Sequence, residues 1–182
     1  DHGDEGVKGL ISVIGVKYTT ARDVAEKAVD QVFRSCGRKP PKSCSSSTPL
    51  HGGQIQRFET FLKNQIAARA HGLNSDAVRR LVYNHGSAYP EVLQFLPPRD
   101  QTSPPAIDSA LLKAEVLHGV RMEMAQKLSD VIFRRTEHGS IGHPGKNVLQ
   151  VCADVMSEEL GWNEHRIRRE LQEVENVFSA WQ

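Results

Sequence analysis

The sequence of 182 residues contains few cysteines, no long apolar run and no excess of charge of either sign. Its three cysteines, Cys36, Cys44 and Cys152, are odd in number and lack short metal-binding spacings, which argues against a disulfide framework and a zinc site. Reduced thiols are typical of cytoplasmic proteins, so we expect a cytoplasmic location. No apolar segment approaches the ~18 residues that a membrane span needs. The formal net charge of +1 gives no reason to expect nucleic acid as a partner.

Phosphate-binding signatures are also missing. The glycines near the N-terminus do not have the spacing of the dinucleotide fingerprint Gly-x-Gly-x-x-Gly. Residues 139–147 are similar in composition to a P-loop, but Ser140 stands where the first glycine is needed and Asn147 follows Lys146 in place of Ser or Thr. No strand pattern precedes this segment. We therefore interpret it as a Gly/Pro-rich turn between helices.

The eight histidines do not form a recognisable ligand pattern. His138 and His143 are five residues apart on the predicted loop, whereas a zinc pair on one helix face needs a spacing of four. We expect histidines that are exposed or satisfied within the core, and we predict no metal ligands. The sequence also lacks a nucleophile elbow and a recognisable Cys–His dyad, so it predicts no catalytic residue.

Helical periodicity dominates from residue 51 onward. Apolar residues recur on one face at Ile55, Phe58, Leu62 and Ile66, and again at Ile167, Leu171, Val174 and Phe178. Ser75 and Asn163 are placed to cap helices, Gly86 and Gly161 to end them, and Pro90 to begin one. A further helix is expected from about Ser109, with Leu112, Val116 and Val120 on one face. Residues 51–182 are therefore predicted to form an all-α domain.

The N-terminal part has a different pattern. Residues 10–14 are β-branched and apolar and end at Gly15, which predicts a short buried strand. A helix is expected after Thr20, which has capping-box spacing to Asp23. Residues 37–53 are rich in proline, serine and glycine and are interpreted as a linker. Because the chain begins at Asp1 and reaches the apolar run within ten residues, we expect it to be a fragment of a longer protein.

The loop from Gly15 to Thr20 is the best candidate binding segment. The start of the following helix directs free backbone N–H groups and a partial positive charge at this loop. Lys17 adds a full positive charge at the same place. These features suit an anion, such as a phosphate or the N1–C2=O edge of a reduced flavin. An ordinary capped helix with a surface lysine is the alternative interpretation.

Three segments together resemble a known family. The stretch from Gly9 to Arg22, with Gly15, Lys17, Thr19 and Thr20 as a Gly-x-Lys-x-Thr-Thr core, looks like the last flavin-contacting stretch of FAD-dependent glycerol-3-phosphate dehydrogenases. Residues 114–121 and 128–136, the latter ending in Arg134-Arg135-Thr136, are similar to the helical C-terminal domain of this family. So is Gly161-Trp162, which leads into the charged final helix.

The resemblance implies a mainly α fold, with a bundle-like helical domain at residues 51–182. Residues 1–36 would be a strand-loop-helix remnant of an FAD-binding domain, joined through the linker at 37–53. The intact protein would oxidise sn-glycerol 3-phosphate to dihydroxyacetone phosphate and pass electrons to a quinone or another acceptor, whereas the chain alone would be inactive. The cofactor contacts would come from Gly15, Val16, Lys17, Tyr18, Thr19 and Thr20, and Lys17 would also hold the substrate phosphate.

The resemblance also implies partners. The protein's own N-terminal FAD-binding domain would pack on this chain, and FAD would be bound mainly there, so that the chain alone holds little or none. A homodimer is one alternative for the oligomeric state, and attachment to the inner face of the membrane is an alternative for the intact protein. A function from a different class is also open, in which the chain is a stand-alone helical interaction module without catalytic activity.

Overall fold

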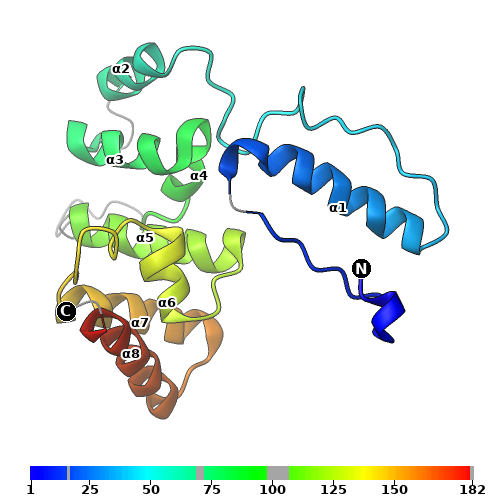
Figure 1. Cartoon of the computed structure of the whole chain (residues 1–182). Helices are drawn as coiled ribbons and strands as arrows, with labels where there is room; N and C mark the ends of the chain where they lie inside the picture. Colours follow the sequence, from blue (N-terminus) through cyan, green and yellow to red (C-terminus); the bar gives the residue numbers. More distant parts are fainter. Residues whose placement is uncertain (16, 69–71, 98–106, 181–182) are drawn as a thin grey trace. The chain divides into compact units, whose positions relative to one another are not determined.

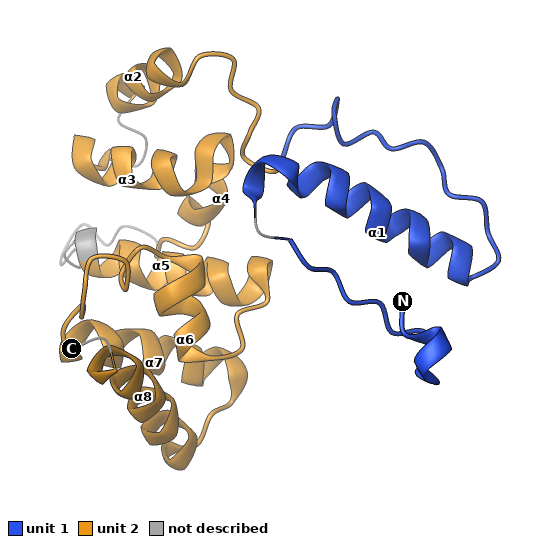
Figure 2. Ribbon diagram, in the orientation of Figure 1, with its two compact units in different colours: residues 1–50 blue, residues 51–182 orange. Residues whose placement is uncertain are grey.

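The computed structural model describes residues 1–15, 17–68, 72–97 and 107–180. These residues form two compact units, residues 1–50 and residues 51–182, which are described one at a time (Figure 2). Helices are the only regular secondary structure in the described ranges, which confirms the predicted mainly α class.

Unit 1 consists of one long helix and two short 3-10 turns. The turns are η1 (Gly3–Glu5) and η2 (Tyr18–Thr20), and η2 leads directly into α1 (Ala21–Ser35). None of its described residues is buried, and Val29 and Val32 of α1 are about half exposed. Unit 1 therefore has no hydrophobic core of its own.

The predicted strand at residues 10–14 is not formed. These residues are irregular, and no described segment pairs with them in a ladder. A strand exists only when a neighbouring segment accepts and donates its backbone hydrogen bonds, so apolar β-branched residues alone do not produce one. The prediction was wrong for the chain as described.

Unit 2 holds the remaining helices (Figure 1). They are α2 (Phe58–Ala68), α3 (Ser75–His85), η4 (Gly86–Ala88), α4 (Tyr89–Leu93), α5 (Ile107–Glu123), α6 (Leu128–Asp130), the π-helical turn η5 (Val131–Arg135), α7 (Lys146–Leu160) and α8 (Glu164–Ser179). In the described part of the chain, no helix combines the length and the apolar character that crossing a bilayer requires.

Asparagine side chains cap two of these helices. Asn163 accepts a hydrogen bond from the backbone N–H of Arg166 at 2.9 Å and begins α8, as predicted. Asn74 does the same for α3 by accepting from the N–H of Ala77 at 2.8 Å. The predicted cap, Ser75, is instead the first residue of α3. Because Asn74 has the extended backbone of an N-cap and a side-chain oxygen within reach, it supplies the cap one residue earlier.

Two hydrophobic clusters meet at α5. One cluster gathers residues of α2, α3 and α4 and includes Leu111 and Ala114 of α5. The other gathers residues of α6, η5, α7 and α8 and includes Val116 of α5. In Figure 1, α5 accordingly lies between the layer of α3 and α4 and the layer of α7 and α8. Helix α5 contributes residues to both clusters, so it positions the two halves of unit 2 relative to each other.

Two glycines fix the end of α3 by direct backbone packing. Gly86 follows α3 with φ 57° and ψ −134°, and a Cβ placed on it would lie 2.1 Å from the carbonyl oxygen of Gly52. A Cβ on Gly52 would lie 2.2 Å from the carbonyl oxygen of His85. The N–H of Ser87 donates to the Gly52 oxygen at 2.8 Å. This close approach holds His85 at a defined place.

We predict that Gly86→Ala lowers the free energy of unfolding by more than ~2 kcal/mol, because alanine is strained at this backbone conformation and its Cβ collides with Gly52. Gly161→Ala is the matched control, since Gly161 also ends a helix with positive φ but has open space around its Cβ position. Its cost should be about 1 kcal/mol. Urea unfolding of both variants measures the difference, and equal losses would contradict the role given to the Gly52–Gly86 contact.

Candidate functional site

The segment predicted to bind an anion lies at the start of α1. Lys17 has extended backbone and precedes η2, and its carbonyl oxygen accepts hydrogen bonds from the N–H of Thr20 at 3.3 Å and from the Thr20 hydroxyl at 3.0 Å. Gly15, Lys17, Tyr18, Thr19 and Thr20 are all exposed. Val16 lies outside the described residues. Residues 17–20 thus form one short exposed turn with the lysine at its beginning.

The capping box predicted from Thr20 and Asp23 does not form. The Thr20 hydroxyl is directed to the carbonyl of Lys17, and Asp23 pairs with Lys27 one turn further along α1 at 2.8 Å. Thr20 has φ −101° and ψ 3°, outside the extended conformation from which a threonine caps a helix. Helix α1 therefore begins without a side-chain cap, and the N–H of its first residue, Ala21, donates to the carbonyl of Tyr18 within the preceding turn.

The Gly/Pro-rich segment at residues 139–147 is a structural turn, as interpreted from the sequence. The N–H of Gly139 donates to the carbonyl of Ile132 at 3.0 Å, and a Cβ on Gly139 would lie 2.7 Å from the Phe133 ring. His143 accepts a hydrogen bond from the N–H of Gly145 at 2.9 Å and lies 3.1 Å from a carboxylate oxygen of Glu175. These contacts fasten the turn to η5 and α8.

Charged and polar side chains gather around one buried carboxylate of α5 in unit 2. Glu115 of α5 is 3% exposed, and one of its carboxylate oxygens lies 3.1 Å from Nη2 of Arg80 and 3.9 Å from Nε2 of His138. Arg80 also lies 3.8 Å from Glu137. Burial raises the pKa of Glu115 to about 7, although the nearby Arg80 opposes the shift. Burial, together with Arg80, lowers the pKa of His138.

A groove of about 630 Å³ lies beside this group. Its polar lining includes Arg80 and His138, together with Asn74, Asp76, Ser109 and Asn147, and its apolar lining comes from Ala77, Leu112, Val148 and Val151. Asn74 is engaged in capping α3, and Arg80 is engaged by two glutamates. Asn74 and Arg80 therefore serve the fold first.

A second polar cluster in unit 2 was not predicted from the sequence. His85 at the end of α3, His118 within α5 and Glu123 at the end of α5 come together, with one potential ligand atom from each lying within 4.8 Å of the other two. The rings of His85 and His118 are edge to face, with centroids 5.1 Å apart. Because 33 positions separate the two histidines, no local spacing rule could have found them.

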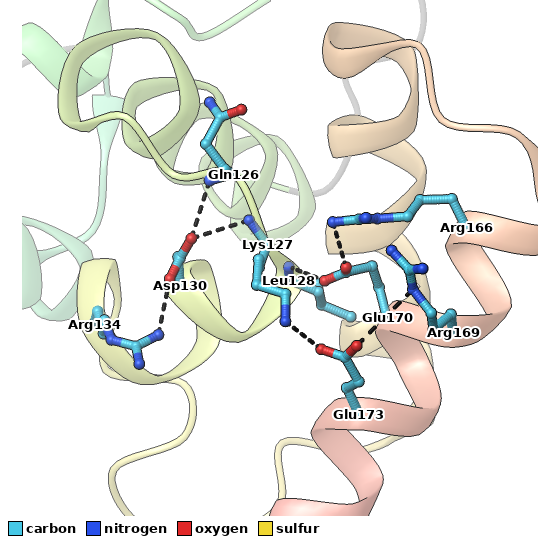
Figure 3. Close-up of polar contacts among 9 residues, drawn as sticks. All are labelled: Gln126, Lys127, Leu128, Asp130, Arg134, Arg166, Arg169, Glu170 and Glu173. Atoms are coloured by element: carbon cyan, nitrogen blue, oxygen red, sulfur yellow. Dashed lines mark hydrogen bonds and ion pairs between the residues drawn. The ribbon is translucent and has the colours of Figure 1, made fainter.

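The loop before α6 is held by one carboxylate. Asp130 accepts hydrogen bonds from the N–H groups of Gln126 and Lys127, both at 3.0 Å, and pairs with Arg134 at 2.8 Å (Figure 3). Arg135, the second arginine of the pair noted in the sequence, lies 3.9 Å from Glu123. These two arginines therefore make structural ion pairs.

A second carboxylate links this loop to α8. Glu170 is fully buried, accepts the N–H of Leu128 at 2.9 Å and pairs with Arg166 at 2.7 Å (Figure 3). Lys127 reaches Glu173, one turn along the same helix, and that contact is partly exposed. A buried charge of this kind is tolerated only when its hydrogen-bonding partners are in place, so Glu170 fixes the position of α6 against α8.

Comparison with known proteins identifies the class of this helical fold. The family model for the C-terminal domain of alpha-glycerophosphate oxidase matches residues 43–167. That match covers most of the chain, and the chain belongs to this family. The resemblance noted in the sequence is thereby confirmed.

Curated relatives and a solved structure agree with this assignment. Over 174 residues the chain is 27% identical to the glycerol-3-phosphate dehydrogenase of Synechocystis sp., covering 94% of the chain and 31% of that protein. It is 30% identical to the glycerol-3-phosphate dehydrogenase of Mycobacterium leprae, covering 91% of the chain and 28% of that protein. The structure of the Bacillus halodurans glycerol-3-phosphate dehydrogenase complexed with FAD superposes with a TM-score of 0.69, at 28% identity, over 89% of this chain and 34% of that one. The chain spans about a third of the length of these proteins.

We predict that Glu170→Leu lowers the free energy of unfolding by about 2–4 kcal/mol, because it leaves the buried Leu128 N–H without its acceptor and Arg166 without its partner. Glu173→Gln, on the same helix but with a side chain that is 40% exposed, is the matched control and should cost less than about 1 kcal/mol. Chemical denaturation compares the two. A loss no larger for Glu170→Leu than for the control would be inconsistent with the role of Glu170.

We also predict a pH-dependent contribution from Glu115. Its pKa in the folded protein, about 7, is above the ordinary value of 4.5, so folding is favoured while the carboxyl is protonated and this contribution is lost as pH rises from about 4.5 through 7. The stability of Glu115→Gln relative to the unmodified chain should therefore rise between pH 5 and pH 8, by an amount of order 3 kcal/mol.

Denaturant unfolding at both pH values measures this difference. Glu137→Gln is the control, because Glu137 faces the same arginine but its side chain is nearly half exposed, so that water stabilises its charge. A stability difference for Glu115→Gln that does not change with pH would show that burial does not control the Glu115 carboxyl.

Proposed function

We propose that this chain is the C-terminal part of an FAD-dependent glycerol-3-phosphate dehydrogenase, which in its intact form oxidises sn-glycerol 3-phosphate to dihydroxyacetone phosphate. The observation that carries the proposal is the alignment of nearly the whole chain, 94% of it, with about a third of an enzyme of that name. The alignment includes unit 1, which a stand-alone helical interaction module would not need. The FAD bound to the related Bacillus halodurans enzyme supports the cofactor.

The turn from Gly15 to Thr20 is proposed to face the flavin, with Val16 included from the sequence pattern. The start of α1, which has no side-chain cap, and the positive charge of Lys17 occur at the same end of the helix, and the helix dipole and this charge both favour a negatively charged group. FAD, when bound, supplies the hydride-accepting chemistry. The part of this chain is to place backbone N–H groups and one ammonium group beside negative charge on the flavin or the substrate phosphate.

Helix α1 provides a second line of support. An isolated helix of its length is only marginally stable in water, and helices of this kind depend on packing of an apolar face. Its apolar residues lack a core within unit 1, with Val29 and Val32 about half exposed. We propose that an FAD-binding domain of the same protein covers this face, so that residues 1–36 complete that domain and residues 51–182 form the helical C-terminal domain.

The remaining assignments follow from the same family resemblance. A quinone or another electron acceptor is proposed to receive the electrons in the intact protein. The location is proposed to be cytoplasmic, with peripheral attachment to the inner face of the membrane as the alternative, and a homodimer is one proposed assembly. No described residue is assigned a catalytic proton-transfer role.

The test is Lys17→Ala in the full-length enzyme that contains this chain. We expect kcat/KM for glycerol 3-phosphate to fall by about 10–100-fold, because one charge-assisted interaction with bound anionic groups is lost. Lys17→Arg should restore part of the activity because it keeps the charge, and Lys8→Ala, an exposed lysine of the same unit, should leave activity unchanged. Steady-state dye reduction measures all three.

The isolated chain provides a second test of the proposal. It should bind FAD weakly or not at all and should show no turnover of glycerol 3-phosphate, because most of the cofactor contacts lie elsewhere in the proposed enzyme. A yellow, active preparation of the chain alone would overturn the assignment of these residues as a C-terminal part. Unchanged kinetics in Lys17→Ala would remove Lys17 from the site and leave the family assignment intact.

A further inference from the structure

Unit 2 contains three side chains with metal-binding chemistry that the proposed dehydrogenase function does not use. We propose that His85, His118 and Glu123 bind one divalent transition-metal ion, of which Zn²⁺ is the best match. His85 comes from the end of α3, and the other two residues come from α5. Bound in this way, the ion joins two helices that belong to different segments of the chain.

The geometry brings the ligand atoms close to the required separation. One potential ligand atom from each residue lies within 4.8 Å of the other two. With metal–nitrogen and metal–oxygen bonds of about 2.0–2.2 Å, ligand atoms in a tetrahedral site are about 3.3–3.6 Å apart. The side chains must therefore approach one another by about 1.5 Å at most. Glu123 is at the end of its helix with a partly exposed side chain, so it can supply much of that movement.

The buried histidine provides an independent indication. His118 is 4% exposed, and its Nδ1 has no hydrogen-bond partner among the described residues. A buried polar atom without a partner costs free energy, which an ion in this position would relieve. The ring of His85 lies edge to face with that of His118, with the centroids 5.1 Å apart, so a second imidazole is already beside the buried one.

The surrounding charges are compatible with a cation. Arg80 is the nearby positive group that acts on His85, but its charge is shared by Glu115 at 3.1 Å and Glu137 at 3.8 Å. Glu91 contributes negative potential at His85. Glu123 has one competing partner, Arg135 at 3.9 Å, and a loose and partly exposed ion pair of this kind is worth little.

The ligand types select the ion. Two imidazoles and one carboxylate suit zinc and its neighbours in the transition series, whereas Mg²⁺ and Ca²⁺ prefer sites made of oxygen atoms. Three protein ligands leave a fourth position, which water can occupy on the side of the exposed Glu123 carboxylate. The ion would act as a structural tie between α3 and α5.

Calorimetric titration of the metal-free chain with Zn²⁺, without an affinity tag, tests the proposal. We expect saturation at one ion per chain, visible absorption bands when Co²⁺ is used as the probe, and no binding of Mg²⁺ at the same concentration. A hundredfold excess of Zn²⁺ over its dissociation constant should raise Tm by about 5–10 °C. His85→Gln and Glu123→Gln should each weaken Zn²⁺ binding at least about tenfold, since even outer partners of ligands are worth that much.

The control is His51→Gln. His51 pairs with Glu91 at 3.1 Å on the surface, and the described residues bring no third potential ligand to this pair. Its removal should leave Zn²⁺ affinity unchanged, and circular dichroism establishes that each variant is folded. His118 is left in place because it is buried. The proposal is overturned if Zn²⁺ does not saturate at one site, if either ligand variant binds like the unmodified chain, or if His51→Gln weakens binding as much as His85→Gln.

Discussion

Helix α5 is buried on both of its sides, and most of unit 2 depends on how its polar residues are accommodated. Leu111 and Ala114 belong to one hydrophobic cluster and Val116 to the other. Glu115 and His118 are only 3% and 4% exposed, so these two polar residues of α5 must find their surroundings inside the protein. Arg80 of α3 and His138 of the loop after η5 approach Glu115 for this reason. The polar contacts of α5 thus fix which neighbours its two sides can have.

Buried polar side chains have different kinds of partner in the two halves of unit 2. Between α6 and α8, one carboxylate oxygen of the buried Glu170 accepts a backbone N–H, and the other forms an ion pair with Arg166 at 2.7 Å. Around His118, the neighbours are rings and a carboxylate, and one nitrogen remains without a partner in the described residues. Native proteins leave few such atoms without a cause. Among the described residues, buried atoms without a hydrogen-bond partner also occur on Glu115, His138, Arg166 and Glu170, but these four side chains take part in ion pairs. His118 lies instead beside two further potential metal ligands, His85 and Glu123.

Sequence reasoning succeeded where structure is decided by neighbours in the chain. The cap at Asn163 and the apolar face of α8 were recognisable because both follow local spacing rules. It failed for the strand at residues 10–14, since a ladder needs a second segment, and for the capping role of Thr20, since its hydroxyl turned back to Lys17. For α5, the sequence predicted one apolar face made of Leu112, Val116 and Val120. The helix also buries the polar residues Glu115 and His118. Periodicity cannot reveal that, because a two-sided helix has no single face.

Unit 1 contains a recognisable sequence motif, but it has no hydrophobic core of its own. The residues that resemble the flavin-contacting stretch are exposed, and the adjoining helix has no buried residue. Hydrogen bonds between Thr20 and Lys17 shape the turn locally, but two such bonds on an exposed surface are worth only about 1 kcal/mol each. A site for an anion needs N–H groups held in fixed positions before the ligand arrives, because ordering them on binding would consume the binding free energy. The turn can be that rigid only when the apolar face of α1 is packed against another surface. In the proposed enzyme, the packing of α1 is therefore part of the binding site, and the lysine and the helix start act only as far as that packing holds them.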